Sequence, residues 1–391
     1  MTRSSSAVVE VKAGTTAATP FASRLTRTRS SAAAEIKASA SAVASFASRL
    51  IAWQRKHGRH DLPWQNTADP YRIWLSEIML QQTQVTAVVP FYERFLLAFP
   101  DLPALARAPL ERVLELWSGL GYYSRARNLH RCAQSVMDEF GGALPYDVEA
   151  LRQLPGIGRS TAAAIAAFAF GTRATILEGN VKRVLARHAG VEGFPGQRKV
   201  EEQLWRIAED RLPKKHIEAY TQGLMDLGAT VCTRANPSCM RCALAADCVA
   251  LHTGRVGALP TPRPKRTLPR RAVTMLLLLR HDAVLVERRP PLGIWGGLWS
   301  LPELPEDITV ERHCATRFAA RARADAPLPA IEHGFTHFHL RITPQPCTVL
   351  AWDARAEEPG LLWLPLLEAR TAALPAPIKK LLLGLRPPPP I

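Results

Sequence analysis

The chain has 391 residues, which is long enough to bury two separate hydrophobic cores, and it carries a formal net charge of +16 with a pI of about 10.0. So basic a composition favours a polyanionic partner. No apolar stretch is long enough to span a bilayer and no basic amphipathic helix stands out, so nucleic acid is favoured over a membrane as the partner.

The first 49 residues are rich in Ala, Ser and Thr and carry seven Lys or Arg against two acids. This composition predicts a disordered, weakly basic tail. Mitochondrial transit peptides have a similar composition, because they are rich in Arg and Ser and poor in acids. We expect a cytoplasmic protein at the nucleoid of a bacterium, or a mitochondrial or nuclear one if the tail is a eukaryotic targeting segment.

Residues 50–252 show the three- and four-residue apolar spacing of helices almost throughout. The segments expected to be helical are 70–98, 123–140, 160–170, 180–189, 199–211 and 216–231. Within LRQLPGIGRSTAAAIAAF (151–168), two helices flank a tight glycine turn, the helix-hairpin-helix pattern. Gly156 and Gly158 allow a DNA phosphate to approach the backbone, and the N–H groups at the following helix start attract it. An ordinary helical hairpin is the plainer alternative.

Four cysteines follow in one short run, with six, two and five residues between them: Cys232, Cys239, Cys242 and Cys248. Four thiolates so close in sequence can close on one metal centre. Only one pair has the tight C-x2-C spacing, which favours a [4Fe–4S] cluster and leaves structural zinc as the alternative. A disulfide pairing is disfavoured because nothing at the N-terminus resembles a secretory signal. Packing is the expected role of the isolated cysteines, Cys132, Cys314 and Cys347.

Residues 253–271 contain four prolines, six Lys or Arg and no acid, which predicts an extended interdomain linker attracted to phosphate. After this linker the apolar period changes. VTMLLLLRHDAVLVERR predicts two strands about a turn at His281-Asp282, and FTHFHLRITPQPCTVLAW predicts two more. The expected fold is therefore a mainly α domain over 50–252 followed by a smaller α+β domain over 272–391.

A helix-hairpin-helix ahead of such a cysteine run resembles the endonuclease III superfamily of base-excision DNA glycosylases. The stretches that narrow the resemblance to the MutY family of adenine DNA glycosylases are LPWQ (62–65), DPYRIWLSEIMLQQTQV (69–85), GLGYYSRARNLH (119–130), LPGIGRSTAAAI (154–165), GNVKRVLAR (179–187) and QGLMDLGATVC (222–232). The stretches that resemble its Nudix-like C-terminal domain are WGGLWSLPE (295–303), FTHFHL (335–340) and ALPAPIKKLL (373–382). The resemblance implies a helix-hairpin-helix domain with an iron–sulfur loop and a Nudix-like domain that recognises 8-oxoguanine. It also implies a monomeric enzyme that hydrolyses adenine from 8-oxoguanine:adenine, and also guanine:adenine, mispairs in double-stranded DNA.

The resemblance also supplies catalytic roles. Glu77 matches the general acid that protonates adenine, which requires a dry pocket to raise its pKa. Glu178 stands where the family has an Asp in Asp-Gly-Asn-Val, so the charge beside the oxocarbenium sugar is kept on a longer side chain, unless Glu178 turns outward unused. Asn180 either caps the following helix or hydrogen-bonds the catalytic carboxylates. Ser160 replaces the Schiff-base Lys of bifunctional relatives, which implies hydrolysis through water, and it can also cap the second hairpin helix.

Further matches concern the mispair. The residues matched to the wedge beside the lesion are Gln82 and Tyr122, with core packing as the alternative for the tyrosine. Those matched to 8-oxoguanine contacts in the first domain are Thr83 and Leu120. Those matched to the adenine pocket are Trp64, Gln65 and Gln222.

In the second domain, Phe335-Thr336-His337 matches an F-S-H loop that touches the oxidised base, with Thr keeping the Ser hydroxyl. Arg234 and Arg241 lie between cluster cysteines and match loop cations that contact phosphate; solvated surface arginines are the alternative.

Three rival functions stay open. An endonuclease III-like glycosylase/lyase on oxidised pyrimidines is disfavoured by Ser160 and by the second domain. Nucleotide pyrophosphohydrolysis by the C-terminal domain is disfavoured because the stretch after Gly296 lacks the G-x5-E-x7-R-E-x-x-E-E carboxylates that bind Mg²⁺. A non-catalytic mispair sensor is suggested only by Glu178.

Overall fold

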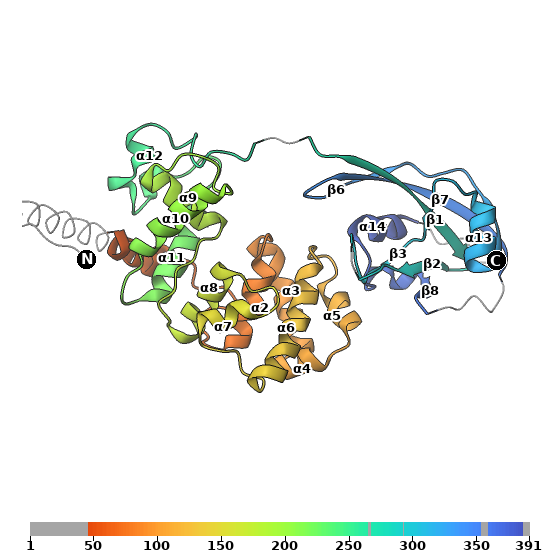
Figure 1. The fold of residues 1–391 in the computed structure, drawn as a ribbon, viewed down its shortest axis with the longest axis horizontal. Coiled ribbons are helices and arrows are strands. Elements are labelled where there is room, and N and C mark those ends of the chain that lie inside the picture. Colours follow the sequence, from red (N-terminus) through yellow and green to blue (C-terminus); the bar gives the residue numbers. More distant parts are fainter. Residues whose placement is uncertain (1–45, 265–266, 292, 353–358, 386–391) are drawn as a thin grey trace, which may run out of the picture.

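The computed structural model describes residues 46–264, 267–291, 293–352 and 359–385, which form a helical domain and a β-rich domain side by side (Figure 1). Most of the expected tail lies outside the described residues. The tail was expected to extend to residue 49, but residues 46–57 form a helix and Phe46 is only 1% exposed. An apolar face that begins at Phe46 packs in the core, so the folded part of the chain starts before residue 50.

The helical domain is built from short helices joined by tight loops. Their bounds are α2 Pro70–Leu80, α3 Val85–Ala98, α4 Leu102–Arg107, α5 Leu110–Trp117, α6 Ser124–Phe140, α7 Val148–Gln153, α8 Arg159–Phe170, α9 Gly179–Ala189, α10 Arg198–Asp210, α11 Ile217–Thr230, η1 Cys239–Arg241, η2 Ala245–Asp247 and α12 Val249–His252. Several of these helices end on a left-handed glycine, as at Gly141 after α6 and Gly190 after α9. This terminator explains why α6 and α9 match the predicted ranges closely.

Two hydrophobic clusters divide the helical domain. One cluster contains apolar residues of α2 to α8, among them Trp74 and Trp117. The other contains the 46–57 helix with α9 and α11, and includes Leu50 and Leu227. The N-terminal helix thus packs against the C-terminal half of the domain, which leaves an opening between the two halves.

The helix predicted over 70–98 is two helices. α2 ends at Leu80 and α3 starts at Val85, and Gln82 between them adopts a left-handed backbone with φ of 57°. The apolar spacing runs through this break, so the pattern alone predicts one helix. The break turns residues 81–84 into a loop at the end of α2.

The β-rich domain holds one mixed sheet with helices. Its elements are β1 Arg270–Arg280, β2 Ala283–Arg288, β3 Trp299–Ser300, β4 Glu303–Leu304, α13 Val310–Phe318, β5 Ala320–Ala324, β6 Ile331–Gly334, β7 His339–Trp352, β8 Leu361–Pro365, η4 Leu366–Arg370 and α14 Ala376–Gly384. The order along the sheet is β3-β2-β1-β7-β5, with β1 and β7 parallel and the other pairs antiparallel. The α+β prediction is therefore confirmed.

The strand pair predicted over 335–352 is wrong. Residues 339–352 form the single strand β7, and β6 precedes the 335–338 turn. Pro344 and Pro346 suggest a turn in the sequence, but they stand two residues apart, so both missing N–H groups face the same side of the strand. The carbonyls of both prolines still accept hydrogen bonds from neighbouring backbone.

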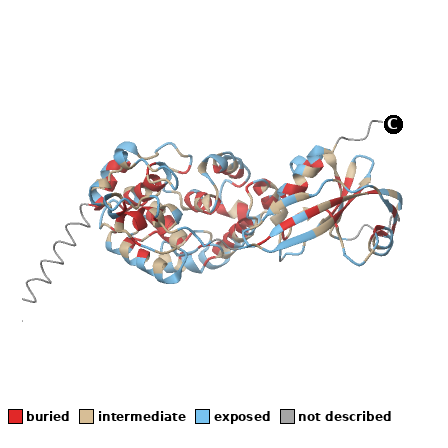
Figure 2. Ribbon diagram, turned by 90° about the horizontal axis from the view of Figure 1, so that it is seen from above, coloured by how far each residue is buried: buried red, intermediate tan, exposed pale blue. Residues whose placement is uncertain are grey.

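The two domains share a hydrophobic cluster. It joins residues of the helical domain such as Leu114 to residues of the β-rich domain such as Trp295 and Leu298, and buried residues run through both domains in Figure 2. Polar contacts accompany it, since Trp299 Nε1 donates to Glu111 Oε1 at 2.7 Å. Among the described residues, no helix is both long and apolar enough to cross a membrane.

Candidate active site

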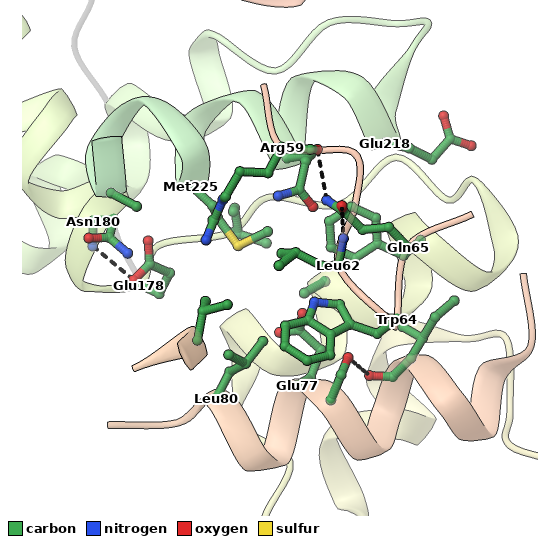
Figure 3. A pocket seen from close by; sticks show the side chains of 18 of the residues that line it. Arg59, Leu62, Trp64, Gln65, Glu77, Leu80, Glu178, Asn180, Glu218 and Met225 are labelled. Atoms are coloured by element: carbon green, nitrogen blue, oxygen red, sulfur yellow. Dashed lines mark hydrogen bonds between the residues drawn. The ribbon is translucent and has the colours of Figure 1, made fainter. Parts of the chain in front are cut away.

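A cavity of about 1370 Å³ opens between the two halves of the helical domain. Its walls come from the 59–67 loop, α2, the 81–84 loop, the start of α8, residues 176–180 and α11. The predicted site residues that line it are Trp64, Gln65, Glu77, Gln82, Thr83, Gly158, Ser160, Glu178, Asn180 and Gln222. Segments far apart in sequence thus meet at one place, as the close-up in Figure 3 shows.

Glu77 rises from the third turn of α2 into this cavity. The helix is well defined, because Asp69 caps it by accepting a hydrogen bond from Tyr71 N at 2.9 Å. Burial raises the pKa of Glu77 to about 7, and the charge of Glu178 raises it too. A carboxyl with such a pKa is about half protonated near neutrality and can serve as an acid.

Glu178 caps α9 with both of its oxygens. Oε2 accepts from Asn180 N at 2.8 Å and Oε1 accepts from Val181 N at 2.9 Å. Burial raises the pKa of Glu178, while these two backbone bonds and the charge of Arg183 act against that rise. The side chain lines the cavity and does not turn outward. The extra methylene relative to Asp is taken up by this folded-back capping geometry.

Ser160 and Asn180 do not cap helices. α8 has Gly158 at its N-cap position without a side-chain cap, and Ser160 Oγ accepts from Leu177 N at 3.0 Å. Ser160 therefore holds the strand-like segment that leads directly into Glu178. Asn180 lies inside α9, where Glu178 already provides the cap.

A hydrogen-bonded path joins Asn180 to the first cluster cysteine. Arg183 donates from Nη2 to Asn180 Oδ1 and from Nε to Cys232 O, both at 2.7 Å. α9 and α11 approach closely here, because a Cβ on Gly228 would lie 2.6 Å from the Asn180 Cβ. Arg183 follows Asn180 by three residues on the same helix face, a spacing that sequence reasoning could have used but did not.

The adenine-pocket candidates are held by their own hydrogen bonds. Gln65 spans a turn, accepting from Leu62 N at 3.1 Å and donating to Arg59 O at 3.0 Å. Gln222 donates from Nε2 to Asp226 Oδ1 at 2.8 Å. The indole of Trp64 packs edge-on against Tyr92 with centroids 5.3 Å apart, and it is 8% exposed.

Sequence reasoning missed Arg59 and Asp226. Asp226 is fully buried, and its oxygens accept from Arg59 Nε at 2.7 Å and from Arg59 N at 2.9 Å. This ion pair ties the 59–67 loop to α11 behind the cavity, so Arg59 reaches the cavity wall. Asp226 follows Gln222 by four residues on α11, and that spacing was the available signal.

The wedge candidates sit on two exposed loops. Gln82 and Tyr122 are both left-handed, with φ of 57° and 48°, and Tyr122 is 47% exposed. Non-glycine residues adopt this conformation rarely, so both loops are strained. The core-packing alternative for Tyr122 is wrong. Leu120 is 6% exposed and packs in the core, and Tyr122 and Leu120 are not among the residues that line the cavity.

The hairpin glycines differ in what they require. Gly156 has φ of +82°, and a Cβ there would lie 2.8 Å from Asn128 Cβ on α6, so packing against α6 demands glycine. A Cβ on Gly158 would have no neighbouring atom within 4 Å. Open space at the start of α8 is what an approaching phosphate needs.

Thr336 and His337 lie in the turn between β6 and β7, away from the residues that line the cavity. Thr336 Oγ1 and His337 Nδ1 are 3.4 Å apart. Phe335 beneath them stacks on Phe338 with centroids 4.6 Å apart. The described structure therefore does not bring these residues to the carboxylates.

The four clustered cysteines line one small apolar cavity with Arg187 and His188. Arg187 donates from Nη1 to Cys232 Sγ at 3.4 Å and to Thr233 O at 2.7 Å. Among the described residues, no group of His, Cys, Asp or Glu has the arrangement for a single metal ion. Four thiols around one small cavity are a donor set that either an iron–sulfur cluster or a zinc ion takes.

The remaining residues singled out in the sequence are two arginines and three cysteines. Arg234 and Arg241 are exposed on the cluster loops. The three isolated cysteines are buried, as expected for packing residues.

Comparison with known proteins agrees with both domains. Residues 75–210 match the HhH-GPD superfamily base excision DNA repair protein family, and residues 274–384 match the NUDIX domain family. An adenine DNA glycosylase of Buchnera aphidicola subsp. Acyrthosiphon pisum (strain APS) is 33% identical over 346 residues, covering 85% of this chain and 95% of that protein. The adenine DNA glycosylases of Mus musculus and Homo sapiens are 33% and 32% identical, covering 84% of this chain and 76% and 72% of theirs.

Proposed function

Because the chain belongs to the family of adenine DNA glycosylases, hydrolases of N-glycosyl bonds in base-excision repair, we propose that it releases adenine paired with 8-oxoguanine or guanine in double-stranded DNA. The observation that carries the proposal is the placement of Glu77 and Glu178 in one cavity, with the pKa of Glu77 raised to about 7. Two carboxyls with different environments provide an acid and an anion at the same pH.

In the proposed reaction, Glu77 donates its proton to a ring nitrogen of the extruded adenine. Protonation makes adenine a better leaving group, and the glycosidic bond then breaks to leave an oxocarbenium-like sugar. Glu178 stays ionised, because two backbone N–H groups and the N-terminus of α9 stabilise its charge, and it stabilises the sugar cation. Water attacks the sugar, since Ser160 has no amine to form a Schiff base, and the proton that the water loses returns to the carboxylate of Glu77.

The adenine itself is proposed to bind between Trp64 and the amides of Gln65 and Gln222. Both amides are oriented before the base arrives, because each is already hydrogen-bonded to the protein. Preorganised contacts lose little freedom on binding. Asn180 completes the site as a support of Glu178, and Arg183 fixes its amide.

Within the duplex, we assign Gln82 and Tyr122 to the space that the extruded adenine vacates, because both are exposed on strained loops. Thr83, Thr336 and His337 are assigned to 8-oxoguanine. Leu120 contacts the lesion through its backbone, since its side chain packs in the core.

Cys232, Cys239, Cys242 and Cys248 would hold a [4Fe–4S] cluster. The cluster would fix the loops that carry Arg234 and Arg241, so that both arginines contact DNA phosphates. The backbone at Gly156 and Gly158 would contact phosphates as well. Iron and acid-labile sulfide at about four atoms each per chain support the assignment. Zinc without sulfide would overturn it.

We further propose that one chain suffices for catalysis, because both carboxyls, both wedge residues and the adenine pocket come from the same chain. The proposed domains are a helical domain up to residue 252, a linker over 253–271 and a lesion-recognition domain over 272–391. The proposed location is the cytoplasm, at the nucleoid.

A single experiment separates the proposal from its rivals. Single-turnover release of adenine is measured on duplexes with 8-oxoguanine:adenine, guanine:adenine and thymine:adenine pairs, beside a thymine glycol duplex with borohydride. Release from the first two pairs and no trapped adduct supports the proposal. A borohydride adduct on thymine glycol would indicate a glycosylase/lyase, and tight lesion binding without release would indicate a mispair sensor.

A further inference from the structure

Arg125 is a buried cation beside the two loops that carry the wedge residues. It lies in the first turn of α6 and is 6% exposed. A positive charge near a helix N-terminus opposes the helix dipole, so the helix itself gives no reason for an arginine there. Burial of the guanidinium also costs free energy unless its N–H groups are satisfied.

The partners of Arg125 are almost all backbone carbonyls. Nη1 donates to the oxygens of Ile78, Met79 and Gln81 at 3.1, 2.7 and 2.6 Å. These carbonyls end α2, where the helix dipole is negative. Arg125 thereby closes the C-terminal end of the helix that carries Glu77.

The other terminal nitrogen holds the second loop. Nη2 donates to the carbonyl oxygens of Leu120 and Gly121 at 3.3 and 3.2 Å, and to Thr83 Oγ1 at 3.0 Å. Its Nε is buried without a hydrogen-bond partner among the described residues. One guanidinium therefore bridges the 81–84 loop and the 118–123 loop, which we call the wedge loops.

Two of these carbonyls have special positions. Gln81 O belongs to the peptide group that precedes Gln82, and Gly121 O belongs to the one that precedes Tyr122. The orientation of the preceding peptide plane enters the φ angle of the next residue, and Gln82 and Tyr122 are the non-glycine residues of their loops with a left-handed backbone. A left-handed non-glycine residue persists only where its surroundings hold it.

We propose that Arg125 is a positioning residue that fixes the backbone of both wedge loops, so that Gln82 and Tyr122 enter the duplex as one unit. The inference rests on the proposed function, because it assumes that both residues fill the space left by the extruded adenine. Arg125 itself touches no reacting atom. Its guanidinium also faces the rings of Trp117 and Tyr122, at 5.3 and 5.4 Å from their centroids.

Base extrusion gives the direct readout. Glu77→Gln protein binds a duplex in which 2-aminopurine replaces adenine opposite 8-oxoguanine, and the fluorescence rise on extrusion is followed at saturating protein below the unfolding temperature. Adding Arg125→Lys should slow this rise by about tenfold or more, because a lysine reaches few of the six acceptors and displaced loops misalign the wedge. Arg125→Gln, which leaves no buried charge, should act in the same direction.

Arg131→Lys is the matched control, since Arg131 lies on the same helix, is exposed, and bonds to Asn128. It should leave extrusion unchanged. Equal rates for the Arg125 and Arg131 variants would overturn the proposal.

A double-mutant cycle separates positioning from a general loss of folding. In a Gln82→Ala/Tyr122→Ala background the Arg125→Lys change should have no further effect on extrusion, since the side chains that it positions are gone. The same tenfold loss in both backgrounds would show that Arg125 acts elsewhere. Adenine release by the unaltered protein is measured in parallel, so failure of the proposed function is recognised separately.

Discussion

Burial and the charge of Glu178, which lines the same cavity, together raise the pKa of Glu77 to about 7. The two groups reach this arrangement by different means. Glu77 lies on the inner face of α2, whereas Glu178 is bound to the N-terminus of α9 by two backbone N–H groups. The unequal environments assign the proton to Glu77 and the negative charge to Glu178.

The pH dependence of adenine release follows from this assignment. Glu77 must be protonated, so the single-turnover rate should fall as the pH rises through about 7. Glu77→Gln should lower the rate by at least about 100-fold below pH 7, where Glu77 holds its proton, since the amide has no proton to give. Binding of the lesion duplex should persist. A rate that rises steadily between pH 6 and 9 would contradict the acid role.

The stability of the protein should depend on pH through the same side chain. The pKa of Glu77 is raised in the folded state from 4.5 to about 7, so the folded protein holds the proton more tightly than the unfolded chain. Ionisation of the buried Glu77 lowers the free energy of unfolding. This destabilisation is absent below about pH 4.5 and complete above about pH 7. Glu77→Gln should therefore increase the free energy of unfolding by up to about 3 kcal/mol at pH 8 and by much less at pH 5. Denaturant unfolding at the two pH values measures this, and an equal gain at both would refute it.

Glu178 has a structural and a chemical role that two substitutions separate. Glu178→Ala should cost about 1 kcal/mol of stability through the lost cap and should also abolish efficient release. Glu178→Asp should keep the cap, because aspartate is a preferred N-cap residue, and should keep release within about tenfold of the unaltered protein. Thermal unfolding and single-turnover release are measured together. Loss of stability in the aspartate variant would mean that the capping geometry is specific to glutamate.

The β-rich domain should influence lesion discrimination through Lys379. Its Nζ donates to Ser118 Oγ at 2.7 Å, at the start of the loop that carries Tyr122. Lys379→Met keeps the aliphatic packing but removes that hydrogen bond, worth about 1 kcal/mol, and a second one to Arg370 O within the β-rich domain. The ratio of release rates from 8-oxoguanine:adenine and guanine:adenine should fall by about fivefold.

Lys380 provides the control for this prediction, because it is the next residue, is exposed, and carries the same charge. Lys380→Met should not change the ratio. An equal fall in both variants would assign the effect to net charge and not to the contact with Ser118.

The helices that sequence reasoning located well are those with a local stop signal. α6, α8 and α9 end at left-handed glycines, so apolar spacing and terminator agree. The break after α2 has no such signal. Gln82 takes a glycine-like conformation because Arg125 and its partners hold the loop, and that tertiary cause is not visible in the spacing.

The site residues that the sequence predicted are those that lie within the stretches resembling the MutY family. Glu77, Glu178 and Asn180 meet in one cavity as the resemblance implied. Capping was considered for Asn180 and Ser160 and not for Glu178, because glutamate is an uncommon N-cap residue. Arg125 escaped notice because its partners are carbonyls, which every residue has and no sequence pattern marks.

The shared hydrophobic cluster between Leu114 and Leu298 binds the two domains into one thermodynamic unit. If the two domains were produced as separate proteins, each would expose the apolar surface of this cluster to water, and each should aggregate. Heat should melt the described parts of both domains in a single calorimetric transition. Heat or damage that unfolds either domain should then unfold the other with it.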